Sequence, residues 1–502
     1  MVVRRSVAAV VLVGLLLVGL GAGMTTAAPA PGTLRVSYLQ RILSLDPHGS
    51  AGAERMSWII GRHLYNQLVS WDYTAKKFQP QLALRWRNVD PTTWEFELRR
   101  GVKFHDGRDF TAASVKTSLE RVIAMKGPLA PLFAPVQSVE MPDPYRVIIK
   151  TQDPVGTLLS SLTILAMVPA GTPPTPDFGD HPIGTGPFKF TEFVRDARLV
   201  LDANPNYWQQ GVPKAQRLIF VDIPEVAARA TAVETGEIDI AVGLPPEEMK
   251  RLRTIQGVKV EVGPTTLTRA LWINASRPPF TDVRVRHALQ HAINVNAITS
   301  SLVAGIATPS TSSIASNVVC YAKMPSISYD TTLARKLLAE AGFPRGFDTS
   351  IKWTEGNPKE REVSDAIVGQ LALVGIRVRN MQQPRAIWLD DLLKLNWDFE
   401  IATTGGGTGD PDFTLRRLYH TRSKRTGWSN PEFDKLMDDA AASVNLQQRC
   451  AMYKRAQEII WDQGPAVFLF DPLESYAYRT RVQGFTAPPA EIFSVANAAV
   501  SP

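Results

Sequence analysis

The chain has 502 residues, of which 44% are hydrophobic, and its formal net charge is +7. This length suggests about three domains or lobes of roughly 150 residues each, and the composition is ordinary for a soluble globular protein. Basic residues are scattered, with only short clusters such as LRRG and TRSKRTG, so they indicate a solvated basic surface and exclude a nucleic-acid footprint.

The first residues follow the order of a secretory signal peptide. Arg4 and Arg5 precede an apolar run over residues 7–20, and the small residues TTAAPA come next. The run is shorter than the roughly 20 residues that span a bilayer. We therefore expect residues 1–28 to be a signal peptide cleaved within residues 27–30, with twin-arginine export left open as an alternative to the general route.

Cysteine usage fits an exported protein. No cysteine stands near the signal segment, so a lipid anchor has no attachment residue, and we expect a soluble periplasmic protein. Cys320 and Cys450 would meet an oxidising compartment, where they either pair or remain as two buried thiols, because sequence does not give the distance between them. Neither belongs to a CxxC motif, so zinc and dithiol chemistry are not expected.

The first third of the chain predicts short strands and two helices. Residues 33–40, TLRVSYLQ, alternate apolar and polar side chains as a strand does, and an apolar stripe from Trp58 to Leu68 predicts a helix. A strand, a turn at Asp106-Gly107 and a helix capped by Thr111 follow. Residues 126–187, rich in proline and glycine, are typical of a loop-rich lobe of their own.

The rest of the chain alternates strands and helices. Residues 186–265 contain strands such as GPFKFTEF and RLIFVDI around the helix EVAARATAVETGE, which indicates an α/β lobe. From residue 267 onward the alternation repeats. Asp330 is expected to cap the helix TTLARKLLAEAG, which Gly342 ends, and a further helix precedes the strand IRVRNM.

A glycine-rich segment, TTGGGTGDPDF over residues 403–413, follows the apolar run WDFEIA. It lacks the Lys-Ser/Thr of a phosphate loop, and no helix-forming segment is expected directly after it, so a phosphate cradle is disfavoured. Glycines allow close approach of the backbone to a ligand, and we expect the segment to line a cleft.

Sequence motifs for catalysis or metal binding are not found. His287 and His291 share a helical face, but Ala288 stands where a zinc protease needs glutamate. The paired acids Asp390-Asp391 and Asp438-Asp439 are expected on solvated helix faces. We therefore expect no catalytic residue, no metal and no cofactor.

Aromatic residues stand beside several predicted loops, and together they fit an apolar, aromatic cleft between lobes. They are Tyr38, Trp272, Trp353, Trp388 and Trp428.

The order of segments resembles the extracytoplasmic solute-binding proteins of ABC importers, specifically the oligopeptide, dipeptide and nickel-binding family. The matching stretches cover nearly the whole mature chain: SLDPHG, LRRGVKFHDGRDFTAASVKTSLERV, GTGPFKF, NPNYW, VETGEIDIAVG, PPFTDVRVRHALQHAIN, YDTTLARKLLAEAGFP, LALVGIRV and GDPDF. Each stretch alone is weak, but their common order is specific.

The resemblance implies an α/β, two-lobed Venus-flytrap fold with an extra inserted α/β domain. Lobe I would use residues 32–66, 182–268 and 474–502, the inserted domain residues 67–181, and lobe II residues 269–473. Two strand crossings between the lobes would form a hinge.

The resemblance also implies a function. The protein would capture a peptide or other small solute by closing its lobes and would present the closed form to a membrane permease, acting as a monomer and not as an enzyme. An exported hydrolase or a ligand sensor on the same scaffold is the alternative.

The family pattern fails at two charge anchors. Dipeptide and oligopeptide members carry an acid four positions before the proline of the Asp-Pro step, where Gly407 stands here. Dipeptide binders carry an arginine shortly before the step matching Asn357-Pro358, and Thr354 occupies that place. Without these anchors a buried dipeptide zwitterion would leave its charges unpaired.

We therefore hypothesise a ligand other than a free dipeptide: a larger peptide held by its backbone, or an uncharged or glycan-like solute stacked on tryptophan. The expected ligand-contacting residues are Tyr38, Gln40, Trp272, Trp353, Thr354, Trp388, Thr404, Gly405, Gly406, Gly407 and Asp410.

Overall fold

The computed structural model of the chain describes residues 32–354 and 359–501. The predicted signal peptide and the Asn357-Pro358 step lie outside these residues. Across the two described ranges, no helix combines the length and apolar character that a membrane crossing requires.

One large mixed sheet organises both lobes. Its strands are β1 (Thr33–Ser37), β8 (Phe188–Val194), β9 (Arg198–Ala203), β10 (Arg217–Val221), β11 (Ile240–Val242), β12 (Val258–Pro264), β13 (Thr268–Ile273), β14 (Ala307–Pro309), β15 (Asp348–Trp353), β16 (Arg377–Gln382), β17 (Phe399–Thr404) and β18 (Ala466–Arg479). They lie in the order β16-β15-β17-β13-β18-β11-β1-β10-β9-β8, with β12 and β14 as further partners of β18.

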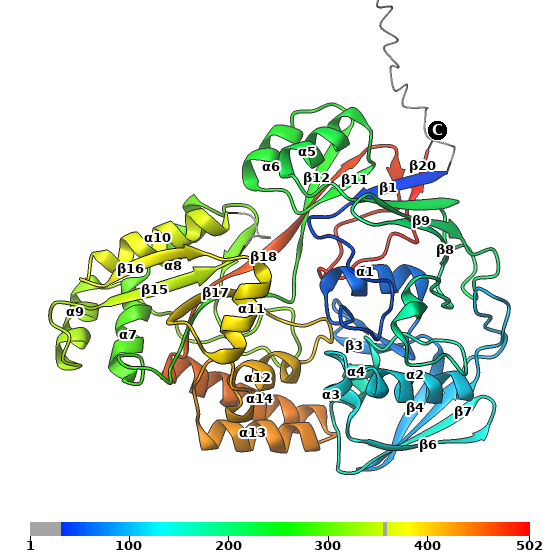
Figure 1. Cartoon of the computed structure of the whole chain (residues 1–502), viewed down its shortest axis with the longest axis horizontal. Helices are drawn as coiled ribbons and strands as arrows, with labels where there is room; N and C mark the ends of the chain where they lie inside the picture. Colours follow the sequence, from blue (N-terminus) through cyan, green and yellow to red (C-terminus); the bar gives the residue numbers. More distant parts are fainter. Residues whose placement is uncertain (1–31, 355–358, 502) are drawn as a thin grey trace, which may run out of the picture.

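The long strand β18 is shared between the lobes. Its first part pairs with β13 and β14, and its second part pairs with β11 and β12. Figure 1 shows β18 running obliquely through the middle of the molecule. The chain crosses between the lobes here and in the short link from β12 to β13, residues 264–268.

The first lobe contains both ends of the described chain. Besides its strands it has α1 (Arg55–Leu64), η1 (Pro176–Gly179), α5 (Val226–Thr235), α6 (Pro246–Leu252), β19 (Val482–Gln483) and β20 (Ala499–Val500). Leu34 and Val36 of β1 and Ile59 and Ile60 of α1 are buried in one core. Burial of each such side chain contributes roughly 1.5–3 kcal/mol, so this core anchors α1 against the sheet.

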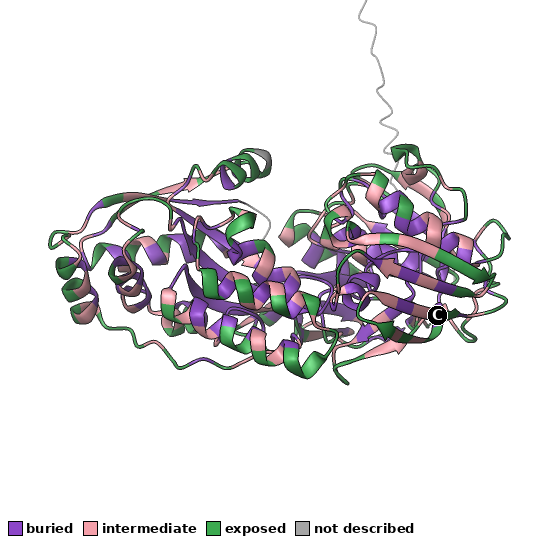
Figure 2. Cartoon of the chain, turned by 90° about the horizontal axis from the view of Figure 1, so that it is seen from below, coloured by how far each residue is buried: buried purple, intermediate pink, exposed green. Residues whose placement is uncertain are grey.

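The second lobe is buried on both faces of its sheet. Its helices are α7 (Val283–Ala292), α8 (Val295–Ser301), α9 (Thr331–Glu340), α10 (Glu360–Ala372), α11 (Arg385–Lys394), α12 (Pro411–Tyr419), η2 (Thr421–Ser423), α13 (Pro431–Ala442) and α14 (Leu446–Gln463). Leu271 and Ile273 of β13 join the core of α7, α9 and α10, whereas Ala270 and Trp272 join that of α11 to α14. Figure 2 shows the buried strands between the two sets of helices.

A separate antiparallel sheet, in the order β4-β5-β7-β6, packs beneath the first lobe in Figure 1. This part comprises β2 (Val69–Asp72), β3 (Lys77–Pro80), β4 (Ala83–Asp90), β5 (Thr93–Leu98), α2 (Ala112–Ala124), α3 (Ala130–Phe133), β6 (Val136–Asp143), β7 (Arg146–Thr151) and α4 (Leu158–Leu162). Its hydrophobic core draws its buried residues from positions 68–167 alone.

Local signals located two helix starts correctly. Thr111 forms a capping box with Ser114 at the start of α2. The carboxylate of Asp330 accepts hydrogen bonds from the N–H groups of Thr332 and Leu333 at the start of α9. Both caps satisfy backbone donors that a helix start leaves free.

Two element boundaries differ from the prediction. α1 ends at Leu64 and does not reach Leu68, because the Gly186 N–H donates to the Leu64 carbonyl (3.0 Å) and occupies the acceptor of the next turn. The expectation that no helix follows the glycine-rich segment was wrong, since α12 begins at Pro411 with Asp410 as its N-cap. Proline is well suited to the first helical position.

The cysteines and the paired acids are also resolved. Cys320 and Cys450 form a disulfide with their Cα atoms 4.7 Å apart. The expectation of a solvated face was wrong for Asp391, which is buried and pairs with Lys352 at 2.6 Å. Lys352 comes from β15, so distant sequence supplies the partner that makes this burial tolerable.

Candidate functional site

A cleft of about 460 Å³ opens between the two lobes, a size that ligand sites commonly have. The first lobe and its attached sheet contribute Gln40, Ser50, Ala53, Glu54, Arg55, Trp58, Pro128 and Glu491. The second lobe contributes Arg269, Trp272, Thr354, Glu360, Arg385, Trp388, Leu389, Leu392, Leu393, Ile401, Ala402, Thr403, Gly405, Gly406, Phe413, Arg417, Leu418 and Arg425, and the link between the lobes contributes Leu267. Because both lobes line it, a ligand in the cleft would touch both.

The glycine-rich segment leaves β17 and forms part of the cleft wall. A Cβ atom at Gly407 would stand 2.8 Å from the Trp58 ring and closer still to Ile492, and one at Gly406 would collide with Phe413. The Trp58 and Phe413 rings themselves meet edge-on at 6.3 Å. Glycine is required because these rings occupy the space, so an acidic side chain at position 407 has no room.

Two arginines in the cleft wall are already satisfied. Arg269 pairs with Glu360, and its guanidinium also donates to the Thr403 hydroxyl. Burial raises the pKa of Glu360, and Arg269 opposes this shift. Arg55 donates to the Tyr38 hydroxyl (2.7 Å) and lies 3.5 Å from the Glu474 carboxylate. These groups hold the walls in place.

Three further arginines at the cleft, Arg385, Arg417 and Arg425, have no carboxylate at ion-pair distance among the described residues. Arg417 lies over the Phe413 ring at 4.9 Å, and Arg385 lies over the Trp388 ring at 4.9 Å. The side chain of Arg417 is exposed to the cleft, and its pKa is lowered to about 10, mainly by enclosure between the cleft walls and in smaller part by the neighbouring charge of Arg425. The site therefore carries concentrated positive charge.

Glu400 lies on β17 near Arg425 and is fully buried. Neither oxygen of its carboxyl group has a hydrogen-bond partner within the described part of the chain. Burial raises the pKa of Glu400 to about 9, with Lys352 and Arg425 opposing the shift and Asp391 reinforcing it. At neutral pH this acid is protonated, so it does not neutralise Arg425.

The predicted ligand-contacting residues divide into two groups. Those that line the cleft are Gln40, Trp272, Thr354, Trp388, Gly405 and Gly406. Trp272 and Trp388 are only 3% and 5% exposed, so each presents little more than an edge to a ligand.

The remaining predicted residues do not line the cleft and have other contacts. The Trp353 indole donates to the Asn380 side chain (2.7 Å) within a core, and the Thr404 hydroxyl donates to the Thr268 carbonyl. Gly407 lies against Trp58, and Asp410 caps α12. Tyr38 is buried and donates to Glu474.

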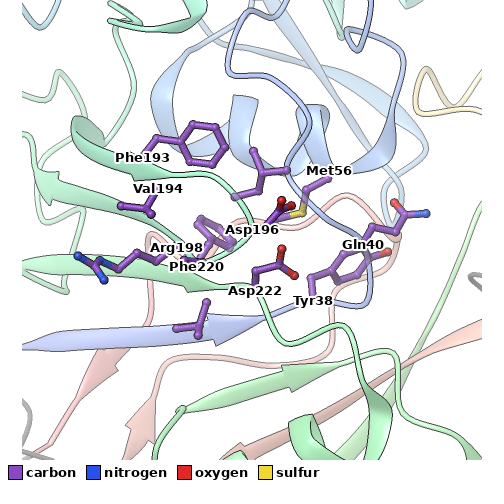
Figure 3. A pocket seen from close by; sticks show the side chains of 12 residues that line it. Tyr38, Gln40, Met56, Phe193, Val194, Asp196, Arg198, Phe220 and Asp222 are labelled. Carbon is purple, nitrogen blue, oxygen red and sulfur yellow. The ribbon is translucent and has the colours of Figure 1, made fainter.

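Tyr38 and Gln40 also border a second cavity of about 10 Å³, with Phe193, Asp196 and Asp222 around it (Figure 3). That volume holds about one water molecule, so it is not a solute site.

The sequence analysis missed the charged lining. Arg417 stands in the LRRLY run of α12, and Arg425 belongs to the cluster TRSKRTG that indicated a solvated surface. Glu54, at the N-cap of α1, faces Arg417 closely enough to raise its pKa. The one available signal was the spacing of Phe413 and Arg417, which puts both on one helical face.

Metal binding has no support in the described residues, where no group of three His, Cys, Asp or Glu side chains could hold an ion. His287 and His291 instead contact the backbone carbonyl oxygens of Asp462 and Ser328.

Comparisons with known proteins give relatives of similar length. The glutathione-binding protein GsiB of Pectobacterium atrosepticum is 28% identical over 472 residues, which cover 91% of each chain. GsiB of Salmonella typhimurium is also 28% identical, over 477 residues that cover 91% of this chain and 92% of the relative.

Solved structures share the fold. The periplasmic binding protein DppA of Helicobacter pylori, in complex with the peptide STSA, has a TM-score of 0.82 at 24% identity and covers 94% of this chain and 98% of its own. The dipeptide binding protein of Pseudoalteromonas sp. SM9913, in complex with Met-Leu, has a TM-score of 0.83 at 24% identity and covers 93% and 100%.

The family model for bacterial extracellular solute-binding proteins, family 5 (middle region), matches residues 77–426. Members of this family are the binding proteins of ABC importers and not enzymes. The match covers more than half of the chain and the two-lobed fold agrees with it, so this chain belongs to the family 5 bacterial extracellular solute-binding proteins.

Proposed function

We propose that the protein captures a small peptide-like solute that carries carboxylates and delivers it to an ABC importer permease. The observation that carries the proposal is the cleft of about 460 Å³ whose lining comes from both lobes and includes three arginines without a carboxylate partner in the described chain. Glutathione, which relatives named GsiB bind, is the first solute to test.

The charge of the cleft favours an anionic solute over the uncharged or glycan-like solute hypothesised from the sequence. A neutral ligand would leave Arg385, Arg417 and Arg425 uncompensated on closure, which is unfavourable because charges removed from water need partners. Glutathione carries two carboxylates and one ammonium. The two carboxylates are complementary in charge to the arginines, and the ammonium is complementary to Glu54 on the opposite wall.

The capture step we propose is closure of the lobes, with the boundaries expected from the sequence. The chain crosses between the lobes in the link after β12 and again within β18, where Pro264 pairs with Leu473 and Arg269 pairs with Phe470. Bending at these two crossings would narrow the cleft. A solute that touches both walls binds the closed form more tightly and shifts the equilibrium towards it.

The setting we propose is the periplasm, which the chain reaches by means of the signal peptide in residues 1–28 and where it acts as a monomer. Light scattering coupled to size-exclusion chromatography should give one chain per particle. Mass spectrometry of the exported protein should show a new N-terminus within residues 27–30.

Native mass spectrometry of the purified protein tests capture, because a solute retained through purification appears as added mass. Calorimetric titration with glutathione, Met-Leu and the tetrapeptide STSA then ranks ligands. Glutathione should bind at least tenfold more tightly than Met-Leu, since the positions of the dipeptide anchors hold Gly407 and Thr354. Absence of retained mass together with absence of heat for all three probes would overturn the proposed function.

A further inference from the structure

Arg417 and Arg425 form a pair of cations in the cleft wall of the second lobe, where the fold fixes their backbones. On α12, Phe413 and Arg417 are one turn apart, and the guanidinium lies over the ring at 4.9 Å. The neighbouring Arg416 turns away and pairs with Asp438 at 2.7 Å. Arg416 is thus held in an ion pair that stabilises the fold, whereas the adjacent Arg417 faces the cleft.

Arg425 is positioned by its neighbour in the chain. The Thr426 hydroxyl donates to the Leu418 carbonyl (3.3 Å), and the Thr426 carbonyl accepts from the Ala275 N–H (2.9 Å). Thr426 is 1% exposed, so the backbone beside Arg425 is fixed. The side chain therefore reaches the cleft from a rigid base.

The two cations repel each other, and neither has a carboxylate at ion-pair distance in the described structure, although Glu54 is near enough to raise the pKa of Arg417. Arg425 is near enough to lower the pKa of Arg417. The carboxyl group of the nearby Glu400 has no hydrogen-bond partner among the described residues, and burial raises its pKa to about 9. Holding like charges together in an enclosed site is unfavourable unless an anion joins them. A carboxylate offers two oxygens and can accept from both guanidinium groups.

We infer that Arg417 and Arg425 form the receptor for a carboxylate of the transported solute, a subsite that replaces the anchors missing at Thr354 and Gly407. This inference rests on the proposed function and adds to it which residues of the cleft hold the carboxylate. Glu54 faces Arg417 from the other lobe, so an ammonium of the same solute would lie on that side.

The test compares Arg417→Gln and Arg425→Gln with a matched control, Arg422→Gln. Arg422 lies in the same basic segment, but its side chain is 82% exposed and it is 3.6 Å from Asp438. Calorimetric titration with glutathione should show affinity lowered roughly 10- to 100-fold in each cleft variant, because each loses a charged hydrogen bond. The control should stay within about twofold of the wild type, since exposed ion pairs contribute little.

Capped probes make the assignment specific. Glutathione with an ethyl ester at the glycine carboxyl and glutathione with an amide at the glutamyl α-carboxyl each lack one carboxylate. One of them should bind the wild type at least tenfold more weakly than glutathione does, and Arg417→Gln should abolish that difference. Circular dichroism spectra that match the wild type would show that both variants fold.

Separate outcomes overturn the two proposals. Unchanged glutathione affinity in both cleft variants, or equal discrimination against the capped probes in wild type and variants, overturns the carboxylate subsite and leaves solute capture intact. Wild-type binding of a neutral sugar but of no carboxylate-bearing probe overturns the subsite too. A wild-type protein that binds none of these probes and retains no solute through purification overturns the proposed function and the subsite with it.

Discussion

The two ends of helix α12 use arginine in opposite ways. At its start, Asp410 and Arg449 are each 5% exposed and meet at 2.6 Å, and the Ser160 hydroxyl donates to the same carboxylate. Nearer its end, Arg417 faces the cleft without a carboxylate at ion-pair distance in the described chain. A paired, buried charge holds the fold, whereas an unpaired charge in a concave site is available to a ligand.

The paired end also joins distant parts of the molecule. Ser160 belongs to α4, and Arg449 on α14 donates to the Gly156 carbonyl as well (3.0 Å). The N–H of Gly156 in turn donates to the Ala441 carbonyl on α13. The glycine-rich segment, which contains the Asp410 cap, is therefore braced by the part of the chain predicted to be the inserted domain.

Removing Arg449 should have the largest effect on stability. Arg449→Leu leaves Asp410 buried without its cation, which should lower the free energy of unfolding by about 3–5 kcal/mol. Urea unfolding followed by circular dichroism measures the loss. Arg455→Leu breaks the exposed pair with Glu432 and should cost less than about 1 kcal/mol. Equal stability of the two variants would contradict the structural role of the paired end.

Removing the disulfide should have the second-largest effect on the free energy of unfolding. Cys320 and Cys450 are 130 residues apart, and the neighbouring Val319 N–H donates to the Gly409 carbonyl of the glycine-rich segment. Replacing both cysteines with serine should lower the free energy of unfolding by about 2–4 kcal/mol, because the unfolded chain regains freedom. Urea unfolding under oxidising conditions measures this loss. An unfolding midpoint equal to that of the wild type would contradict the stabilising role of the disulfide.

Asp471 should make a pH-dependent contribution of up to about 3 kcal/mol to the free energy of unfolding. It lies on β18 where the lobes join and accepts from the Thr268 hydroxyl (2.8 Å). Burial raises the pKa of Asp471 from its ordinary value of 3.8 to about 6, with Thr268 and Ser310 opposing the shift. The folded protein thus holds this proton more tightly than the unfolded chain, and that stability is complete below pH 4 and is lost as the pH rises past 6.

Asp471→Asn isolates this contribution from other acids. The difference in unfolding free energy between the wild type and this variant should fall as the pH rises from 4 to 7. Parallel stability curves across that range would show that Asp471 does not titrate as the burial predicts.

Gly407→Ala should lower the free energy of unfolding by about 1–3 kcal/mol. The added methyl group must displace the Trp58 ring or the Ile492 side chain, and overpacking of this kind strains a core. Gly369→Ala is the control: a Cβ atom there meets no described atom within 4 Å, and alanine is favoured over glycine inside helix α10, so its melting temperature should equal or exceed that of the wild type. Thermal melting of both variants checks the comparison. Equal melting temperatures would mean that the glycine-rich segment accommodates the methyl group without strain.

Local chemistry made the helix caps predictable, but not the site. Thr111 and Asp330 cap helices through contacts with the next few residues, so the sequence carries the whole signal. Trp353 and Trp388 look alike in sequence, yet one is sealed in a core and the other borders the cleft. Which of two tryptophans reaches the cleft depends on packing between distant segments.

The same limit applied to the arginines. Arg416 and Arg417 are adjacent, and the roughly 100° between successive helical residues sends one to Asp438 and the other to the cleft. Asp438 comes from α13, and Arg425 arrives from a loop beyond η2. Motif order identified the family because it spans the chain, whereas ligand charge depends on a few residues outside those motifs.

The measurement that tests the account most directly is the thermal shift that glutathione causes in Arg417→Gln. The melting temperature without ligand should stay close to that of the wild type, because Arg417 has no ion pair within the described residues and its contact with the Phe413 ring contributes only about 0.5–1 kcal/mol. At 100 times its dissociation constant, glutathione should stabilise the wild type by about 2.7 kcal/mol, and most of that stabilisation should be absent from the variant at the same concentration. An undiminished shift in the variant would contradict the claim that the unpaired arginine binds the solute.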